Sequence, residues 1–218
     1  MKKKPLISIV ITYYKKKFFL DKTLKSILKQ TYNNYEIVFV YDDKDLKDLK
    51  YVNKLLLRFK KSRLIINKKN LGVANSRNIA IKYCKGSYLA FIDSDDLWKK
   101  NKLSNQLNFM QKNSHLFSFT SYSVISEKGK IIKKRKVFQD ASYCNLYWSN
   151  FIGLSTVMVS KKIFTKIYFP NLTTQEDFAL WLKLIRQGVK LKHFKQTLSF
   201  WRKTKNSLSS NIIRKFKD

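Results

Sequence analysis

Short apolar runs alternate with amphipathic segments along the first part of the chain, and this alternation restricts the possible folds more than any other feature of the sequence. The runs are rich in β-branched residues, are typical of buried strands, and cover 6–11, 35–41, 64–67 and 88–92. The segments between them place apolar residues at helical spacing and cover 20–31, 49–59 and 74–84. Three successive strand-to-helix units predict a parallel sheet with helices on both faces.

The pattern changes after Leu97. The sequence predicts two further helices and four further strands, at 102–111, 175–187, 116–125, 131–137, 156–159 and 190–194. We expect this second half to be mixed and partly antiparallel. The predicted fold class is therefore α/β, with a mostly parallel central sheet flanked by helices and a mixed second half.

The length of 218 residues suits one domain over 1–210 with a short basic tail over 211–218. Hydrophobic residues make up 44% of the chain, which excludes a disordered protein. Cys84 and Cys144 stand in no metal-ligand or redox spacing, so we expect reduced thiols in a cytoplasmic protein. No apolar stretch approaches the roughly 18 residues that a membrane span requires, so any membrane contact should be peripheral.

Lysine and arginine outnumber the acidic residues by 46 to 14, and the formal net charge is +32. This charge attracts polyanions such as nucleic acid, acidic lipid surfaces or anionic substrates, and by itself it names none of them. Most of these cations are lysines, which are strongly hydrated and recognise base edges poorly. Two explanations of the charge are equally good: a compositional bias towards lysine, or a role in attraction to a membrane.

Acidic residues follow two of the predicted strands. Asp42-Asp43 and Asp93-Ser94-Asp95-Asp96 come after the strands at 35–41 and 88–92. Ligands of such sheets bind beyond the carboxyl ends of the strands, so both groups should face one crevice. Carboxylates gathered in so basic a chain suit Mg²⁺ or Mn²⁺, which prefer oxygen ligands and share substrate phosphates. The alternative is a turn in which Ser94, Asp95 or Asp96 supplies the N-cap of a following helix.

Glu176 and Asp177 begin the predicted helix at 175–187. Their spacing from Thr174 is close to that of a capping box, in which acidic side chains only stabilise the first helical turn. The functional alternative is a general base at Asp177, with Trp181 one turn later forming part of a pocket wall.

Asn70-Leu71-Gly72 opens the loop before the helix at 74–84, and Arg77 lies near the start of that helix. An arginine at this place holds either a diphosphate or the acidic turn. The alternative is a surface salt bridge, which contributes little to stability.

Six blocks of residues occur in a fixed order over about residues 6–210. They are the opening 8–14 with 30–32 and 35–38 (SIVITYY, QTY, YEIV), then 42–43 (DD), 70–78 (NLGVANSRN), 86–88 leading to 93–98 (GSY, DSDDLW), 175–181 (QEDFALW), and 201–202 ahead of 207–209 (WR, SLS). In this order they resemble the family 2 glycosyltransferases, whose fold is the single-domain, Rossmann-like GT-A type. Each block alone is weak, and the ordered set is specific because it covers nearly the whole chain.

The resemblance implies a nucleotide-sugar-binding half over about 1–98 and an acceptor half over about 99–210. By this resemblance, the donor is bound by residues of the first half, namely Thr12, Tyr14, Asp42, Asp43, Arg77, Asp93 and Ser94. Thr12 and Asp43 would contact the base. Asp93 and Asp95 would form the Asp-x-Asp motif, with Asp95 as the direct ligand of Mn²⁺ or Mg²⁺. Such an ion stabilises the leaving nucleoside diphosphate.

The same resemblance implies that Asp177 is the catalytic base. It would take the proton from an acceptor hydroxyl as that hydroxyl attacks the anomeric carbon from the opposite face, which inverts the configuration. Glu176 and Trp181 would lie at the acceptor or in the pocket wall.

Three positions depart from the family pattern. Lys44-Asp45 stands where relatives usually continue with Gly-Ser, so the base-binding loop should be shaped differently. Thr12 replaces a common proline, as in some uracil-binding members. Thr204 stands where many relatives carry a histidine, which puts a metal or diphosphate contact from that place in doubt.

The resemblance therefore implies sugar transfer from a nucleoside-diphosphate sugar, with a UDP-sugar expected, to a saccharide or lipid-linked acceptor in bacterial surface polysaccharide synthesis. We expect a cytoplasmic protein, peripheral on the inner face of the membrane if its charge attracts anionic lipid, and no nucleic-acid partner. Two alternatives remain at this stage: a non-catalytic relative, and a basic protein that binds nucleic acid or another polyanion.

Overall fold

A computed structural model describes residues 4–137 and 139–204. Its first half alternates strands and helices as predicted, with element ends displaced by up to three residues. The elements are β1 (Ile7–Tyr13), α1 (Lys17–Leu28), β2 (Tyr35–Tyr41), η1 (Leu46–Asp48), α2 (Leu49–Leu56), β3 (Ser62–Ile66), α3 (Val73–Tyr83) and β4 (Tyr88–Phe91). The predicted tail at 211–218 and the Ser207-Leu208-Ser209 part of the last block lie outside the described residues.

The second half contains the predicted elements and some that the sequence did not indicate. They are β5 (Leu97–Trp98), α4 (Lys102–Lys112), β6 (Phe117–Ile125), β7 (Ile131–Arg135), α5 (Tyr143–Trp148), η2 (Leu154–Thr156), β8 (Met158–Ser160), η3 (Lys161–Thr165), α6 (Glu176–Arg186) and β9 (Leu191–Arg202). β5 and α5 are too short to show a period. β9 continues beyond the predicted end at residue 194, because its pairing with β6 carries it past a register shift.

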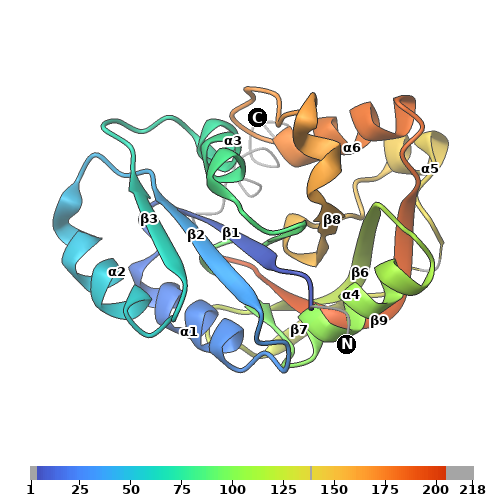
Figure 1. Ribbon diagram of the computed structural model, residues 1–218. Helices are drawn as coiled ribbons and strands as arrows, with labels where there is room; N and C mark the ends of the chain where they lie inside the picture. The colour runs from blue at the N-terminus through green and yellow to red at the C-terminus, as the bar shows by residue number, and fades with distance from the viewer. Residues whose placement is uncertain (1–3, 138, 205–218) are drawn as a thin grey trace, which may run out of the picture.

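In the described chain all strands join one sheet, in the order β3-β2-β1-β4-β8-β6-β9-β5, with β7 paired to β6 (Figure 1). β1 pairs in parallel with β2 and β4, and β2 pairs in parallel with β3. β8 runs antiparallel to both β4 and β6, whereas β6 and β9 are parallel. The predicted parallel first half and mixed second half are therefore confirmed.

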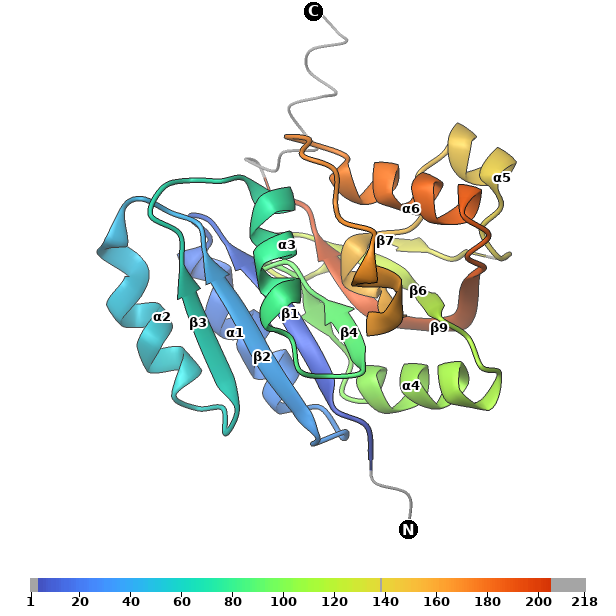
Figure 2. The same cartoon turned by 45° about the horizontal axis from the view of Figure 1, so that its top comes forward.

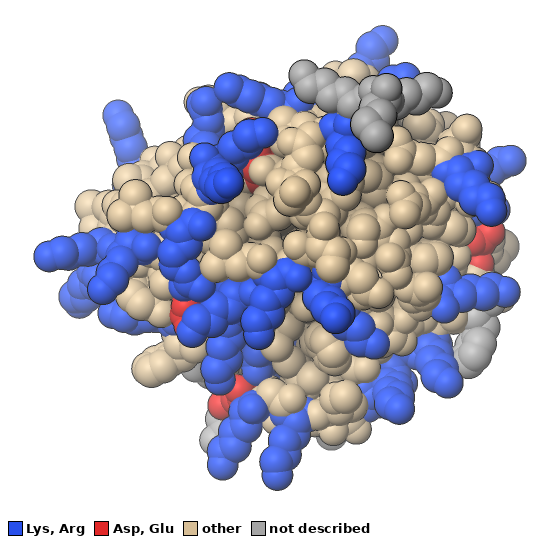
Figure 3. Space-filling model, turned by 60° about the horizontal axis from the view of Figure 1, so that its bottom comes forward, with Lys and Arg blue, Asp and Glu red and all other residues tan. Residues whose placement is uncertain are grey.

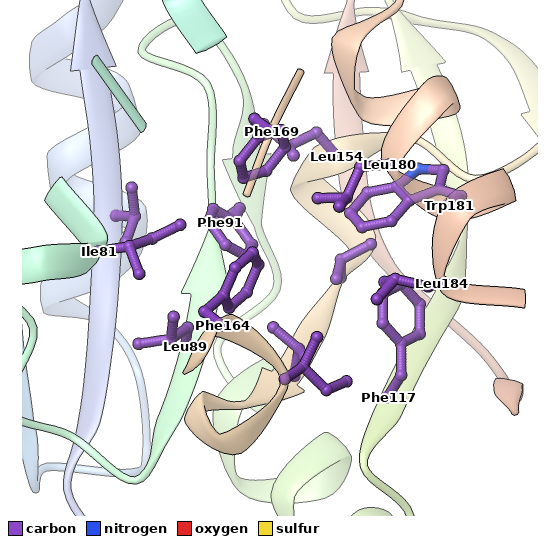
Figure 4. Packing of buried hydrophobic residues seen from close by; sticks show 14 of the residues in the cluster. Ile81, Leu89, Phe91, Phe117, Leu154, Phe164, Phe169, Leu180, Trp181 and Leu184 are labelled. Atoms are coloured by element: carbon purple, nitrogen blue, oxygen red, sulfur yellow. The ribbon is translucent and has the colours of Figure 1, made fainter. Parts of the chain in front are cut away.

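Helices cover both faces of the sheet, as predicted (Figure 2). Leu20 and Leu24 of α1, with buried residues of α2 and α4, pack against the face that carries Ile9 and Ile11 of β1. On the other face Val10 belongs to a second cluster with buried residues of α3, α5 and α6. Alternate residues of β1 point to opposite faces, so this one apolar run serves both clusters. Figure 4 shows the second cluster, in which aromatic rings fill the space between β4, β6 and α6.

The carboxyl ends of β1, β2 and β4 meet at one edge of the sheet, because these strands are neighbours and parallel. The acidic residues that follow β2 and β4 therefore lie at that edge, as predicted. Gly72, in the loop that leads from β3 into α3, has φ 81° and ψ 161°, a backbone conformation open almost only to glycine. Among the helices of residues 4–137 and 139–204, none combines the length and the apolar composition of a membrane span.

Gly86, in the turn from α3 into β4, lies against the start of β1. A Cβ atom at this position would lie 2.6 Å from both the Leu6 carbonyl oxygen and the Ser8 amide nitrogen. Both are backbone atoms that cannot rotate away, so the turn requires glycine.

Gly86→Ala should lower the free energy of unfolding by about 1–3 kcal/mol, because the backbone must shift to relieve the overlap. Gly153→Ala is the matched control, since the nearest atoms to its added Cβ lie 3.8 Å away. Urea unfolding of both variants measures the difference. Equal stability of the two variants would contradict the assigned packing.

Candidate active site

Arg77 joins two of the blocks that lie far apart in the sequence. It is only 4% exposed, in α3, and its Nη2 donates to Asp93 Oδ1 at 2.9 Å. Its Nη1 donates to Glu176 Oε1, and its guanidinium lies over the ring of Phe169, 5.4 Å from Cζ to centroid. Asp93 follows β4 and Glu176 begins α6, so one buried cation connects the acidic turn to the start of that helix. The alternative of a surface salt bridge is therefore wrong for Arg77.

The carboxylates of the acidic turn have separate partners. Asp95 Oδ2 lies 2.8 Å from Lys16 Nζ, and Asp96 Oδ1 accepts the backbone N–H of Arg202 at 2.8 Å. The Arg202 Nε donates to the Asp95 carbonyl oxygen at 2.7 Å. Asp96 is fully buried, whereas the side chains of Asp93 and Asp95 are 36% and 13% exposed. Asp93 and Asp95 are thus the carboxylates that a ligand can reach.

Burial raises the pKa of Asp95, and the ammonium of Lys16 opposes this effect. Burial also raises the pKa of Asp96 well above its usual range, and repulsion from Asp95 and Asp93 adds to it. Carboxylates this close repel one another when ionised, so a cation bound between them would be stabilised.

Asp177 is half-buried in the first turn of α6. Burial raises its pKa to about 7, repulsion from Glu176 adds to the rise, and the charge of Arg77 opposes it. Its Oδ1 accepts the backbone N–H of Phe178 at 2.7 Å. A carboxyl group that ionises near neutral pH suits a general base, because its conjugate base is then both present and basic enough.

The predicted capping box at the start of α6 is wrong. The N-cap residue is Gln175, which has φ 59° and caps the helix with no side-chain hydrogen bond. Glu176 reaches Arg77 instead of the helix N-terminus. A left-handed residue other than glycine costs roughly 1–2 kcal/mol, and such conformations concentrate at functional sites.

Asp42 is a buried residue that holds a neighbouring loop in place at the edge of the sheet. It is 3% exposed, and its Oδ1 accepts from Asn67 Nδ2 and from the Leu71 backbone N–H, both at 2.8 Å. It therefore holds the loop between β3 and α3. Asp43 is also buried, and its Oδ1 accepts the backbone N–H of Asp45 at 3.1 Å. Asp45, at the position expected to alter this loop, caps η1 through a 3.0 Å bond from the Lys47 N–H.

Three further residues expected at the donor have different surroundings. Thr12 is half-buried near the carboxyl end of β1, and Tyr14 beyond it is 47% exposed, so both lie at the edge that carries the acidic residues. Ser94 is 4% exposed, and its carbonyl oxygen accepts from Thr23 Oγ1 of α1 at 3.0 Å. Ser94 thus fixes the acidic turn to α1.

Trp181 does not form a pocket wall. It is fully buried, donates from Nε1 to the Ile152 carbonyl oxygen at 3.3 Å, and packs edge-to-face on Phe117 with centroids 5.0 Å apart (Figure 4). Neighbours cover its whole surface, so the expectation from helical spacing is wrong.

The N-cap alternative for the acidic turn is also wrong, because the strand β5 follows it rather than a helix. The turn itself is present, with the Asp96 N–H donating to the Asp93 carbonyl oxygen at 3.1 Å.

Residues without an assigned role in the sequence also belong to this site. Lys16 is one of a run of lysines that nothing in the sequence distinguishes, yet it pairs with Asp95 and donates to Thr204 Oγ1 at 3.3 Å. Thr204 thus contacts the Lys16 ammonium that pairs with Asp95. Arg202 belongs to the last block and is 1% exposed. Its place under the acidic turn comes from the pairing of β9 with β6 and with β5, the strand that follows that turn.

The residues present are compatible with a hard divalent cation. No group of three or more His, Cys, Asp or Glu side chains within 4–137 and 139–204 is arranged as a metal site. A Mg²⁺ or Mn²⁺ ion that keeps waters and shares a substrate diphosphate needs only one or two carboxylates, and Asp93 and Asp95 offer them. To bind the ion, the Asp95 carboxylate would have to give up its ion pair with Lys16.

Arg77→Met should lower the free energy of unfolding by about 3 kcal/mol, because it leaves Asp93 and Glu176 without their buried cation. Adding Glu176→Gln should recover part of this loss. Arg58→Met removes the half-exposed pair with Asp21 and should cost less than about 1 kcal/mol. Denaturant unfolding compares the three, and similar losses for Arg77→Met and Arg58→Met would contradict the bridging role.

Comparison with solved structures identifies the fold. Staphylococcus aureus TarS, residues 1–349 in complex with UDP-GlcNAc, superposes with a TM-score of 0.78 at 20% identity. The match covers 94% of this chain and 60% of the TarS chain. The present chain therefore has the GT-A fold and spans less than two thirds of that structure.

Sequence comparison identifies the family. TuaG of Bacillus subtilis, whose name assigns it provisionally to teichuronic acid biosynthesis, is 34% identical over 95% of this chain and 83% of its own length. WfaP of Escherichia coli, a UDP-Glc:α-D-GlcNAc-diphosphoundecaprenol β-1,3-glucosyltransferase, is 34% identical over 98% of this chain and 82% of its own length. The model of the glycosyl transferase family 2 matches residues 8–174, and the matched part ends just before Glu176 and Asp177. The chain belongs to glycosyl transferase family 2.

Proposed function

We propose that this protein transfers a sugar from a UDP-sugar to a hydroxyl of a lipid-linked saccharide, with inversion, in the synthesis of a bacterial surface polysaccharide. The observation that carries the proposal is the Arg77 bridge, which joins the Asp93 turn to the helix that begins with Glu176 and Asp177. The bridge brings reachable carboxylates and a carboxyl group with a pKa of about 7 to one edge of the sheet. The names of WfaP and of the TarS complex support a UDP-sugar donor and a lipid-linked acceptor.

The donor base would lie over the carboxyl ends of β1 and β2. Thr12 and Asp43 are the side chains there with the chemistry to contact uracil, since Asp43 accepts hydrogen bonds and Thr12 both donates and accepts. Asp42 acts indirectly, because its carboxylate already holds the loop before α3. Tyr14 offers an exposed ring at the rim, near the place proposed for the base.

The diphosphate would lie over the acidic turn. Asp95 and Asp93 would hold Mn²⁺ or Mg²⁺ together with phosphate oxygens, and Arg77 fixes the Asp93 carboxylate for this role. When bound, the ion supplies Lewis-acid stabilisation of the departing nucleoside diphosphate. Lys16, released from Asp95, would remain close enough to compensate part of the phosphate charge.

Asp177 would remove the proton from the acceptor hydroxyl as the oxygen attacks the anomeric carbon. The new glycosidic bond forms while the bond to the diphosphate breaks on the opposite face, so one displacement inverts the configuration. Glu176 is a positioning residue in this scheme, because its carboxylate is held by Arg77. A non-catalytic relative would have no need of this arrangement. The carboxylates at this edge would also repel the phosphates of a nucleic acid.

The activity should fall tenfold for each pH unit below about 7, because the rate requires ionised Asp177, whose pKa is raised to about 7. Asp177→Asn should lower kcat by about 10²-fold or more and remove this pH dependence while UDP binding persists. Initial rates between about pH 5.5 and 8.5 provide the profile. A flat profile in the wild type, or an Asp177→Asn variant of normal activity, would exclude Asp177 as the base.

Calorimetry with a panel of nucleoside diphosphates, with and without Mn²⁺ or Mg²⁺, tests the metal site. Wild-type protein should bind UDP more tightly than the other diphosphates, and only with metal. Asp95→Ala should weaken this binding by more than about tenfold through loss of a charged ligand. Asp21→Ala is the control, since Asp21 pairs with Lys25 and Arg58 outside the site. Metal-independent binding that survives in Asp95→Ala would exclude the proposed metal role.

A further inference from the structure

Large apolar side chains are exposed beside lysines at the carboxyl edge of the sheet. Phe18, at the start of α1, is 91% exposed, and Ile131 and Ile132, at the start of β7, are 54% and 58% exposed. The lysines that accompany them on the same two segments are all exposed, and they are Lys15, Lys17, Lys128, Lys130, Lys133 and Lys134. We call these nine residues the rim patch.

Arg202 brings the two segments of the rim patch together. Its Cζ lies 5.0 Å from the ring centroid of Phe19, the neighbour of Phe18. Its Nη1 donates at 3.0 Å to the carbonyl oxygens of Ser126 and Glu127, in the hairpin between β6 and β7. Its Nε donates to the carbonyl oxygen of Asp95, so the rim patch borders the acidic turn.

The composition of the rim patch points to one kind of partner. Exposed Phe and Ile side chains lose hydration when they enter the outer layer of a bilayer, and lysines beside them are attracted to anionic headgroups. β7 is an edge strand with an exposed isoleucine pair, a liability that an isolated soluble protein normally avoids. The charge of +32 complements an anionic surface, and Figure 3 shows one face on which Lys and Arg greatly outnumber Asp and Glu.

We infer that the rim patch is a docking surface for an anionic lipid bilayer, with Phe18, Ile131 and Ile132 inserted at the level of the headgroups. This inference rests on the proposed function and gives it a geometry. A bilayer at this edge would face the acidic turn next to Asp95, so a lipid-linked saccharide would project from the membrane towards the reacting groups. The protein would bind the membrane and the acceptor with one edge of its sheet.

Co-sedimentation of the full chain with vesicles tests the inference. Wild-type protein should bind phosphatidylcholine vesicles that contain phosphatidylglycerol, and the binding should fade as salt is raised. Lys133→Gln with Lys134→Gln should weaken binding about 30-fold, as expected for two lysines near an anionic surface. Phe18→Ser with Ile131→Ser and Ile132→Ser should remove the binding that persists at high salt, because that part depends on apolar insertion.

The chain offers matched controls at the opposite edge of the sheet. Leu57 is 84% exposed, and Lys60 and Lys61 are exposed in the same segment before β3. Leu57→Ser, and Lys60→Gln with Lys61→Gln, should leave vesicle binding within about twofold of wild type if the rim patch is the docking surface. Equal losses in these controls, or equal binding of wild type to purely neutral vesicles, would overturn the inference. So would tight binding of single-stranded RNA that needs the rim lysines and ignores the apolar substitutions.

The rim variants also separate this inference from the proposed function. None of the substituted residues contacts the acidic turn or Asp177, so transfer to a water-soluble acceptor should stay at the wild-type rate in every rim variant. Normal transfer with vesicle binding that does not depend on the rim patch would refute the docking surface alone. Vesicle binding that depends on the rim patch, in a protein without donor hydrolysis or transfer, would refute the proposed function alone.

Discussion

The site depends on the buried guanidinium of Arg77. Its two ends bind Asp93, which follows a strand of the parallel half, and Glu176, which begins a helix of the mixed half. Burying an arginine is costly unless carboxylates surround it, and burying those carboxylates is costly without the arginine. Each therefore requires the others. The ion pair between Arg77 and Glu176 therefore fixes the neighbouring Asp177 at one edge of the sheet. The acidic residues that follow β2 and β4 lie at the same edge.

Negative charge is scarce in this chain, and much of it serves structure at that edge. Asp42 holds the loop before α3, Asp96 accepts the backbone N–H of Arg202, and Glu176 pairs with Arg77. Asp93 and Asp95 remain partly exposed. The result is a small acidic centre in a strongly basic molecule. This charge distribution suits a metal-bound diphosphate at the acidic centre, and it suits contact of the basic surroundings with an anionic partner surface.

Local patterns failed where a tertiary contact competed with them. Thr174 and Asp177 have nearly the spacing of a capping box, but Glu176 turns to Arg77 and the helix begins at a left-handed Gln175. Trp181 has the helical spacing of a pocket wall beside Asp177, but the aromatic core encloses it. The acidic turn looked suited to an N-cap, but β5 follows it, because pairing with β9 makes a strand of Leu97 and Trp98. In each case a partner distant in the sequence takes the place of the local motif.

Periodicity and motif order were enough to predict the alternation of strands and helices, the parallel first half, the acidic residues at strand ends, and the family. The folded chain was needed to see that Lys16 is the partner of Asp95 and that Arg202 lies beneath the acidic turn. It was also needed to see that Arg77 is buried between two carboxylates. Ion pairs and burial depend on which segments lie next to one another across the sheet, and the local spacing of residues does not predict those contacts.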